Sequence, residues 1–167
     1  SITIPSSVTS IGYRAFQGCT SLVNITIPSS VTSIDSSAFQ SCTSLVNITI
    51  PSSVTSIGNS AFRTCTSLKT ITFSTGTTTI TSIGEYAFNG CSGIESINIP
   101  RTIGTIGNNA FSSCTSLTTF TMKEATTINN NIFYGNTKLN EITYSGTTKP
   151  ICTNTAFEGS EIYRITV

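Results

Sequence analysis

The chain has 167 residues, the size of one ordinary domain, and only 9% of them are charged, with 8 Lys and Arg against 7 Asp and Glu. Histidine is absent, which excludes His-dependent proton transfer, catalytic triads and His-containing zinc sites. A nucleic-acid partner is not expected, because the few cations are scattered, with Arg14 alone among the first 62 residues.

Hydroxyl side chains replace charge in this sequence, which contains 32 Thr and 26 Ser. Disorder is excluded by the 37% of hydrophobic residues, because they recur at a fixed interval that indicates a repeat architecture. Two columns keep the same spacing of 22–24 residues and share one three-residue insertion between their third and fourth members. They are Phe16, Phe39, Phe62, Phe88, Phe111, Phe133 and Phe157, and Leu22, Leu45, Leu68, Ile94, Leu117, Leu139 and Ile162.

One unit, LVNITIPSSVTSIDSSAFQSCTS from Leu22, predicts three elements in chain order. LxxIxI, which is followed by proline, predicts a short strand. SVTSIG predicts a turn and a second extended piece, whose glycine is expected to supply backbone freedom at a tight corner. AFxxC predicts at most one turn of 3₁₀ or α structure. These corner glycines are Gly12, Gly58, Gly84 and Gly107.

No unit can bury its apolar residues alone, so we expect unit to stack on unit in a solenoid. The insertion, STGTTTITS in residues 74–82, is expected to bulge from the edge of this solenoid as a mobile loop.

The pattern LxxIxIPxSVTxIGxxAFxxCxx, which runs through essentially the whole chain, resembles the BspA-like leucine-rich repeat. Five consecutive units match it closely. The last two depart from it, with Ile132 in place of Ala, Asn136 and Ser160 in place of Cys, and no proline after Tyr144.

The resemblance implies a single right-handed, curved α/β-type repeat solenoid over residues 1–167, with about seven coils of 22–26 residues. Short parallel strands would lie on one side and short 3₁₀ or α turns on the other. The resemblance also implies a surface or secreted protein of mucosa-associated bacteria or protists, which adheres to host matrix proteins or contacts innate receptors.

Five cysteines lie three residues after the column phenylalanine and should stack about 4.8 Å apart, which leaves disulfides open as an alternative. Because Asn136 and Ser160 fill the same place, a small buried group with a weak hydrogen bond is favoured over disulfide or metal roles. Cys152 takes a place filled elsewhere by isoleucine and is expected to be a small core residue. The structural thiol column is Cys19, Cys42, Cys65, Cys91 and Cys114.

The outward positions of LxxIxI form the candidate binding face. Its fifth place is threonine in seven of eight units, which suits an exposed strand with or without a ligand, whereas its second and third places vary and could determine the choice of partner. The candidate residues are Asn24, Thr26, Asn47, Thr49, Lys69, Thr70, Thr72, Glu95, Asn98, Thr119, Thr121, Glu141, Thr143, Tyr163 and Arg164.

We predict a protein-interaction module of a cell-surface or secreted protein, adhering through the strand face, with neither enzymatic activity nor a cofactor. A structural spacer without a ligand is the alternative, and an ice-binding threonine array is a further one. Asn24 and Asn47 begin NIT sequons, which would carry glycans only in a eukaryotic secretory pathway.

Both ends of the chain break off at a strand without a cap, which predicts a fragment of a longer array that associates end to end. No run of about 18 apolar residues could span a membrane.

Overall fold

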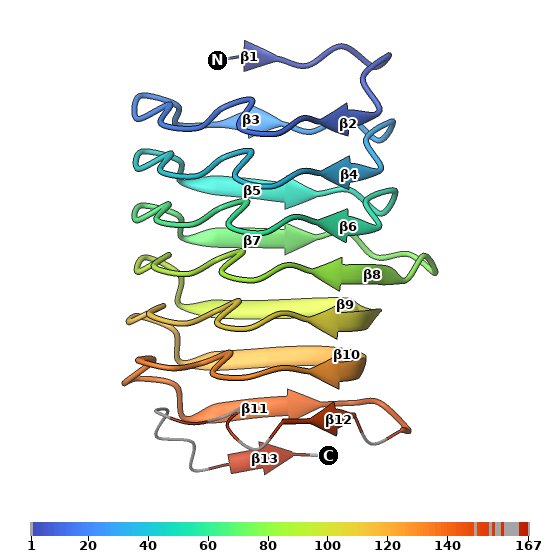
Figure 1. The fold of residues 1–167 in the computed structure, drawn as a ribbon, viewed down its shortest axis with the longest axis vertical. Coiled ribbons are helices and arrows are strands. Elements are labelled where there is room, and N and C mark those ends of the chain that lie inside the picture. The colour runs from blue at the N-terminus through green and yellow to red at the C-terminus, as the bar shows by residue number, and fades with distance from the viewer. Residues whose placement is uncertain (1, 149, 154, 156–157, 159–163, 167) are drawn as a thin grey trace.

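The structure, a computed structural model, describes residues 2–148, 150–153, 155, 158 and 164–166, the last three as backbone only. The chain winds into about seven coils that stack along the long axis of the molecule, with the two termini at opposite ends (Figure 1). The predicted solenoid is therefore confirmed. We number the coils from the N-terminus: coil 1 is residues 1–21, coil 2 is 22–44, coil 3 is 45–67, coil 4 is 68–93, coil 5 is 94–116, coil 6 is 117–138 and coil 7 is 139–167.

The LxxIxI segments form the first sheet, in which neighbouring coils contribute parallel strands. Ile48 and Ile50 are buried while Thr49 between them is exposed, because successive strand residues face opposite sides of a sheet. The strands of this sheet are β1 (Ile2–Thr3), β3 (Ile25–Thr26), β5 (Asn47–Ile50), β7 (Thr70–Phe73), the first part of β9 (Ser96–Ile106), the first part of β10 (Thr119–Ile128), β11 (Glu141–Tyr144) and β13 (Arg164–Thr166).

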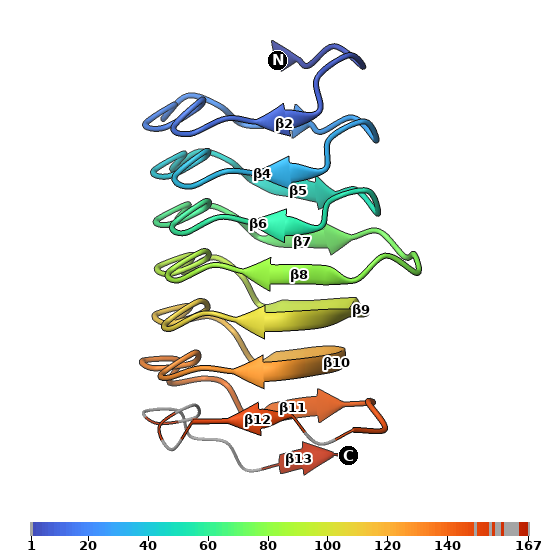
Figure 2. The same cartoon turned by 45° about the vertical axis from the view of Figure 1, so that its right-hand side comes forward.

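The second extended piece is also present and forms a second parallel sheet on another side of the stack (Figure 2). In coils 5 and 6 a single long strand passes from the first sheet into the second, so β9 and β10 belong to both. The other strands of the second sheet are β2 (Ser10–Ile11), β4 (Ser33–Ile34), β6 (Ser56–Ile57), β8 (Ile80–Ile83) and β12 (Ile151–Cys152).

The phenylalanine column forms a continuous stack in the core. Neighbouring ring centroids from Phe16 to Phe111 lie 5.1–5.3 Å apart with nearly parallel planes, and Phe133 follows at 6.3 Å. This spacing is that of offset-stacked rings and follows the rise from coil to coil. Phe157 lies outside the described residues. The predicted alignment of Phe16, Phe39 and Phe62 is confirmed.

The third side of the solenoid, which we call the turn ridge (residues 12–19, 35–42, 58–65, 84–91, 107–114 and 129–136), carries the AFxxC segments. No helix is found here among the described residues, so the expected helical turn is not confirmed. Alternate N–H groups bond within the coil, as from Gln17 to Arg14 O, and the others bond to the next coil, as from Phe16 to Ala38 O at 2.7 Å. A 3₁₀ helix would need consecutive bonds within the coil.

The turn ridge holds two residues per coil at positive φ, the left-handed region that most side chains avoid. One lies two residues before the column phenylalanine and one lies two residues after it. Nine of these residues are not glycine, with φ between 55° and 60°, and three are: Arg14, Ser37, Ser41, Ser60, Thr64, Tyr86, Asn109, Ser113 and Asn131, with Gly18, Gly90 and Gly135.

The corner glycines have a different role from the predicted one, because none of them has a positive φ. A Cβ atom on Gly58 would lie 2.5 Å from the Ser36 backbone nitrogen, and one on Gly107 would lie 2.6 Å from that of Glu85. Close approach to the preceding coil therefore requires glycine at Gly58, Gly84 and Gly107, whereas Gly12 has no such neighbour.

The structural thiol column lies where it was predicted, with Cys19 half-buried and the other four members buried. All five are free thiols. Each buried Sγ donates to the phenylalanine carbonyl of the preceding coil, for example Cys65 to Phe39 O at 3.1 Å. In coil 6 the Asn136 Nδ2 makes the equivalent bond to Phe111 O at 2.9 Å, so one hydrogen bond recurs with two different residue types.

Two expectations need correction. Cys152 pairs in register with Ile128, as its place in the repeat predicts. It is exposed, however, and is not the core residue that was expected, because no described coil covers it on the side away from Ile128. The bulge is also shorter than residues 74–82, because Ile80–Ile83 form strand β8 and only residues 74–79 project from the stack (Figure 1).

Replacing Thr64 by Gly or Asn should relieve about 1 kcal/mol of strain, because a β-branched residue is strained at its φ of 58°. This gain offsets the loss of the hydrogen bond between the Thr64 and Ser41 hydroxyls at 3.0 Å, so the variant should be at least as stable as the parent chain. The check is the free energy of unfolding in urea. The matched control, Thr66→Gly, removes an exposed threonine of the same coil that has no positive φ, and it should destabilise instead. Equal losses from both changes would contradict the assignment of strain.

Burial raises the pKa of Cys42 and of Cys114 to about 12. Because the folded state holds these protons more tightly than the unfolded chain, the free energy of unfolding should fall as the pH rises from about 9 to about 12. Cys114→Ala should make this decline shallower. In a thiol titration at pH 8, Cys42, Cys65, Cys91 and Cys114 should react only after unfolding. Fewer than six reactive thiols in the unfolded, unreduced protein would contradict this account.

Candidate interaction surfaces

The outward residues of the first sheet align in columns along each group of paired strands, with no in-register pairing between β7 and β9. Thr3 pairs in register with Thr26, Thr49 with Thr72, and Thr121 with both Asn98 and Thr143. The neighbouring column runs from Asn24 and Asn47 through Thr70, and then from Ser96 through Thr119 to Glu141 and Arg164. The described candidate residues thus lie on the outward side of the same set of strands. Tyr163 lies outside the described residues, and only the backbone of Arg164 is described.

Charge on this face is sparse. Lys69 and Glu95 are exposed in neighbouring coils and Glu141 is half-buried, while most other members carry hydroxyl or amide groups. In the described part of the face, no side chain of the candidate set takes part in a hydrogen bond. The candidate side chains therefore do not hold the coils together through polar contacts.

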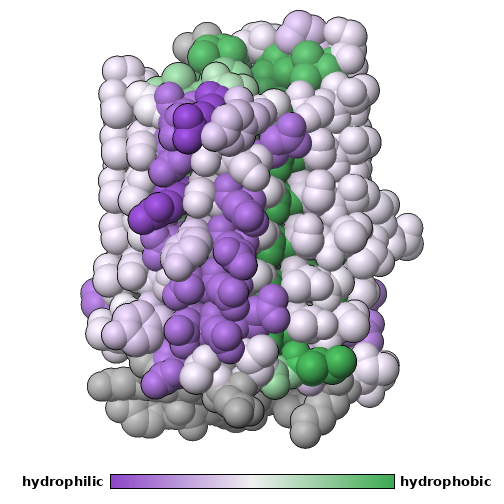
Figure 3. Space-filling model, viewed as in Figure 1, coloured by the Kyte–Doolittle hydropathy of each residue, from purple (hydrophilic) through white to green (hydrophobic). Residues whose placement is uncertain are grey.

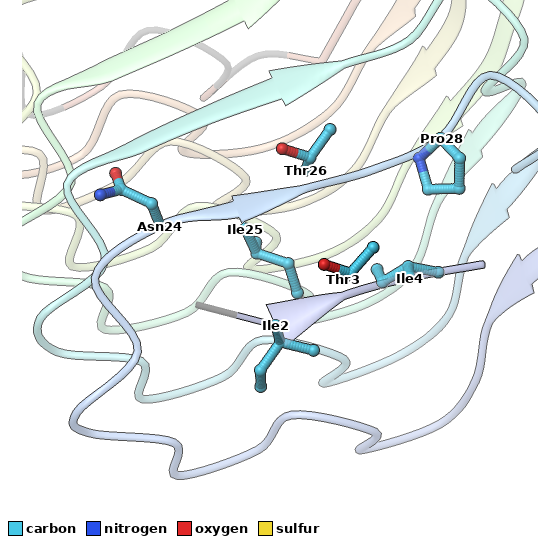
Figure 4. Close-up of a pocket in the computed structure, with 7 residues that line it drawn as sticks. All are labelled: Ile2, Thr3, Ile4, Asn24, Ile25, Thr26 and Pro28. Atoms are coloured by element: carbon cyan, nitrogen blue, oxygen red, sulfur yellow. The ribbon is translucent and has the colours of Figure 1, made fainter. Parts of the chain in front are cut away.

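One hollow borders the face at its N-terminal end, where β1 pairs with β3. A hollow of about 350 Å³ opens there between coils 1 and 2, with Ile2 44% exposed at its edge. Its apolar residues and the outward Asn24 and Thr26 border the same depression (Figure 4). The lining residues are Ile2, Thr3, Ile4, Asn24, Ile25, Thr26 and Pro28.

The turn ridge carries exposed side chains that the sequence analysis missed. Tyr13 is 63% exposed and Tyr134 is 55% exposed, and the guanidinium of Arg14 lies 4.8 Å from the centre of the Tyr13 ring. Arg63 lies in the same way 5.6 Å from the ring centre of Tyr86. Tyrosine and arginine are enriched in protein interfaces. Their irregular positions within the repeat gave no periodic signal that could have revealed them.

Polar side chains beside these residues serve the fold. The Oδ1 of Asn59 accepts the Glu85 N–H at 2.9 Å, and that of Asn108 accepts the Asn130 N–H at 3.1 Å. Figure 3 shows a hydrophilic strip along the stack over the segments that follow β2, β4, β6 and β8. Asn59 and Asn108, which follow β6 and β9, therefore each link one coil to the next.

A second hollow, of about 340 Å³, lies where coils 1 to 4 leave the second sheet. Its lining includes Tyr13, the buried Ile34 and Ile57, and Gly58. Both hollows are shallow depressions in extended surfaces, a shape that suits contact with a macromolecule better than enclosure of a small ligand. The described part of the chain has no helix long and apolar enough to cross a membrane.

Solved structures with the same fold come from several bacteria. A T. pallidum leucine-rich repeat protein is 27% identical, with a TM-score of 0.82 over 98% of this chain and 77% of its own. A leucine-rich repeat protein from Eubacterium ventriosum is 30% identical, with a TM-score of 0.80 over 97% of this chain. A leucine-rich cell surface protein from Faecalibacterium prausnitzii is 26% identical, with a TM-score of 0.54 over 90% of this chain.

This chain spans only 43% of the E. ventriosum chain and 56% of the F. prausnitzii chain. No protein with a curated description matches it significantly. A family profile described as a BspA type leucine rich repeat region, in six copies, matches residues 1–82 and 75–167. Because these two matches together cover every coil, the chain belongs to the BspA-type leucine-rich repeat family.

Proposed function

We propose that this chain is a non-enzymatic interaction module of a bacterial cell-surface or secreted protein, and that it adheres to a host or matrix protein through the candidate binding face. Outside the candidate set, Thr118 on this face donates its hydroxyl to Glu95 O of the preceding coil at 3.0 Å. One observation carries the proposal: the described side chains of the candidate set make no hydrogen bonds that hold the coils together. They can therefore vary without disturbing the fold. Extended surfaces of this kind are what solenoid proteins use for binding, and the F. prausnitzii relative is a cell surface protein.

The contrast with the other sides supports this choice of face. On the second sheet, the Thr32 and Thr55 hydroxyls donate to the carbonyls of Thr9 and Thr32 in the preceding coil. On the turn ridge, Asn59 and Asn108 bind backbone N–H groups of the next coil. Substitution of these hydrogen-bonding side chains costs stability, whereas substitution at Lys69 or Glu95 changes only the surface.

A structural spacer is the second candidate function. It is favoured by the threonine column itself, because threonine pairs on neighbouring strands stabilise a sheet whether or not a ligand is present. An ice-binding array would use the same column, but Asn98 interrupts it. Thermal hysteresis in a freezing assay would support the ice-binding alternative.

Binding should be measured on a panel of immobilised host matrix proteins with the intact chain and two double variants. Lys69→Ala with Glu95→Ala alters the candidate binding face and should weaken binding about tenfold or more. Tyr13→Ser with Tyr86→Ser alters the turn ridge and should change it less than about threefold. Each variant should keep the melting temperature of the parent chain.

The outcomes separate the candidates. If only the turn-ridge variant loses affinity, the binding face has been placed on the wrong side. If the intact chain binds no member of the panel, the spacer is favoured, and attachment of a flanking domain becomes the function to test.

The same module is expected to associate end to end. Ile2 is exposed, and Ile4, Val8 and Phe16 are only partly buried, so coil 1 presents apolar surface and unpaired strand edges. In sedimentation experiments the average mass should rise with concentration, and Ile2→Lys should reduce that rise. A strict monomer at high concentration would contradict this expectation.

A further inference from the structure

Arg101 in strand β9 is 1% exposed, although coils 1 to 3 have a serine at the same place in the repeat. Its Nη1 donates to Ser52 O at 2.9 Å and to Val54 O at 3.1 Å, and its Nη2 donates to Pro51 O at 3.5 Å. The Nε has no partner. Arg101 belongs to coil 5 and its acceptors belong to coil 3, so these bonds pass over coil 4.

The acceptor at Val54 is part of a regular series. In coil 2 the Ser30 hydroxyl donates to Val8 O at 2.6 Å, and in coil 3 the Ser53 hydroxyl donates to Val31 O at 2.6 Å. The next donor in this series would come from coil 4, where the longer segment 74–79 replaces the Pro-Ser-Ser turn. Arg101 supplies the hydrogen bond that this serine would have made.

The junction beside the insertion is also where pairing in the first sheet is interrupted. Strand β7 pairs with β5 but is not paired in register with β9, although β8 and β9 remain paired in the second sheet. The inserted loop rests on the turn that Arg101 binds, because a Cβ on Gly76 would lie 2.9 Å from the Ser52 Cβ. Segment 74–79 and Arg101 thus meet at one turn of coil 3.

We propose that Arg101 is a brace that closes the gap opened by the insertion, joins coil 5 directly to coil 3, and fixes segment 74–79 as a rigid projection. In a solenoid each coil ordinarily contacts only its neighbours. A bond that passes over one coil therefore couples the two halves of the stack at a junction where the first sheet is not paired in register. The inference does not depend on what the protein binds.

The proposal implies that arginine is favourable here only because the serine donor is missing. A buried guanidinium without a carboxylate partner carries a desolvation cost, and burial lowers the pKa of Arg101. The buried carbonyls of coil 3 offset that cost by accepting charge-assisted hydrogen bonds. If a serine hydroxyl were restored in coil 4, the guanidinium would lose this acceptor and keep its cost.

The test is a double-mutant cycle in the full chain, read by melting temperature. Arg101→Ser, which installs the residue of coils 1 to 3, should lower it by about 5–10 °C. In a second background, residues 74–79 are replaced by Pro-Ser-Ser, the turn of coil 3. There Arg101→Ser should leave the melting temperature unchanged or raise it. Arg101→Met keeps much of the buried side-chain volume. If Arg101→Ser does not fold, the melting temperature of Arg101→Met is compared between the two backgrounds instead.

Arg63→Ser is the matched control, because this exposed arginine of the turn ridge should shift the melting temperature by less than about 2 °C in both backgrounds. Cleavage within segment 74–79 by a nonspecific protease should be faster in Arg101→Ser than in the parent chain. Equal losses in the two backgrounds, or no loss in the native background, would overturn the proposal.

Discussion

Register between successive coils is the constraint on which the rest of this structure depends. Each coil hydrogen-bonds its backbone to its neighbours in two sheets and on the turn ridge, so equivalent residues must return to equivalent places. The phenylalanine stack records this return, since its rings repeat at 5.1–5.3 Å through five coils. Extra residues can enter only where the chain projects, which explains why the insertion in coil 4 lies at a corner between the two sheets.

At a given place in the repeat, the packing of the coils requires a particular hydrogen bond but allows different side chains to make it. Asn136 replaces a cysteine and still donates to the phenylalanine carbonyl of the preceding coil, and its Oδ1 also accepts the Cys114 N–H at 2.7 Å. Arg101 replaces the missing serine donor of coil 4 from a different coil. An unsatisfied buried carbonyl is costly, so a substitution is tolerated when another donor reaches the same acceptor.

The sequence predicted whatever depends on periodicity alone. The strands, the inward and outward columns, the thiol column and the aligned phenylalanines follow from residues that recur at one spacing. Features that depend on how two adjacent coils meet, such as close backbone approach and the cover of a residue by the next coil, could not be predicted from the sequence. Gly58 is required by the backbone of coil 2, and Thr64 adopts positive φ in a place that three other coils fill with glycine and two with serine. Cys152 has a core position in the repeat but lacks a described coil to cover it, and Tyr13 follows no period.

The same constraint separates the sides of the solenoid by their freedom to change. Side chains on the second sheet and the turn ridge take part in bonds between coils, so their identity is limited by the fold. On the candidate binding face the backbone makes most of the bonds between coils, with one added by the Thr118 hydroxyl, and the described side chains of the candidate set make none. Side chains of the candidate set can therefore change from coil to coil at little cost in stability, so the irregular charges at Lys69 and Glu95 are less constrained by the fold than the regular threonines, which pair across neighbouring strands.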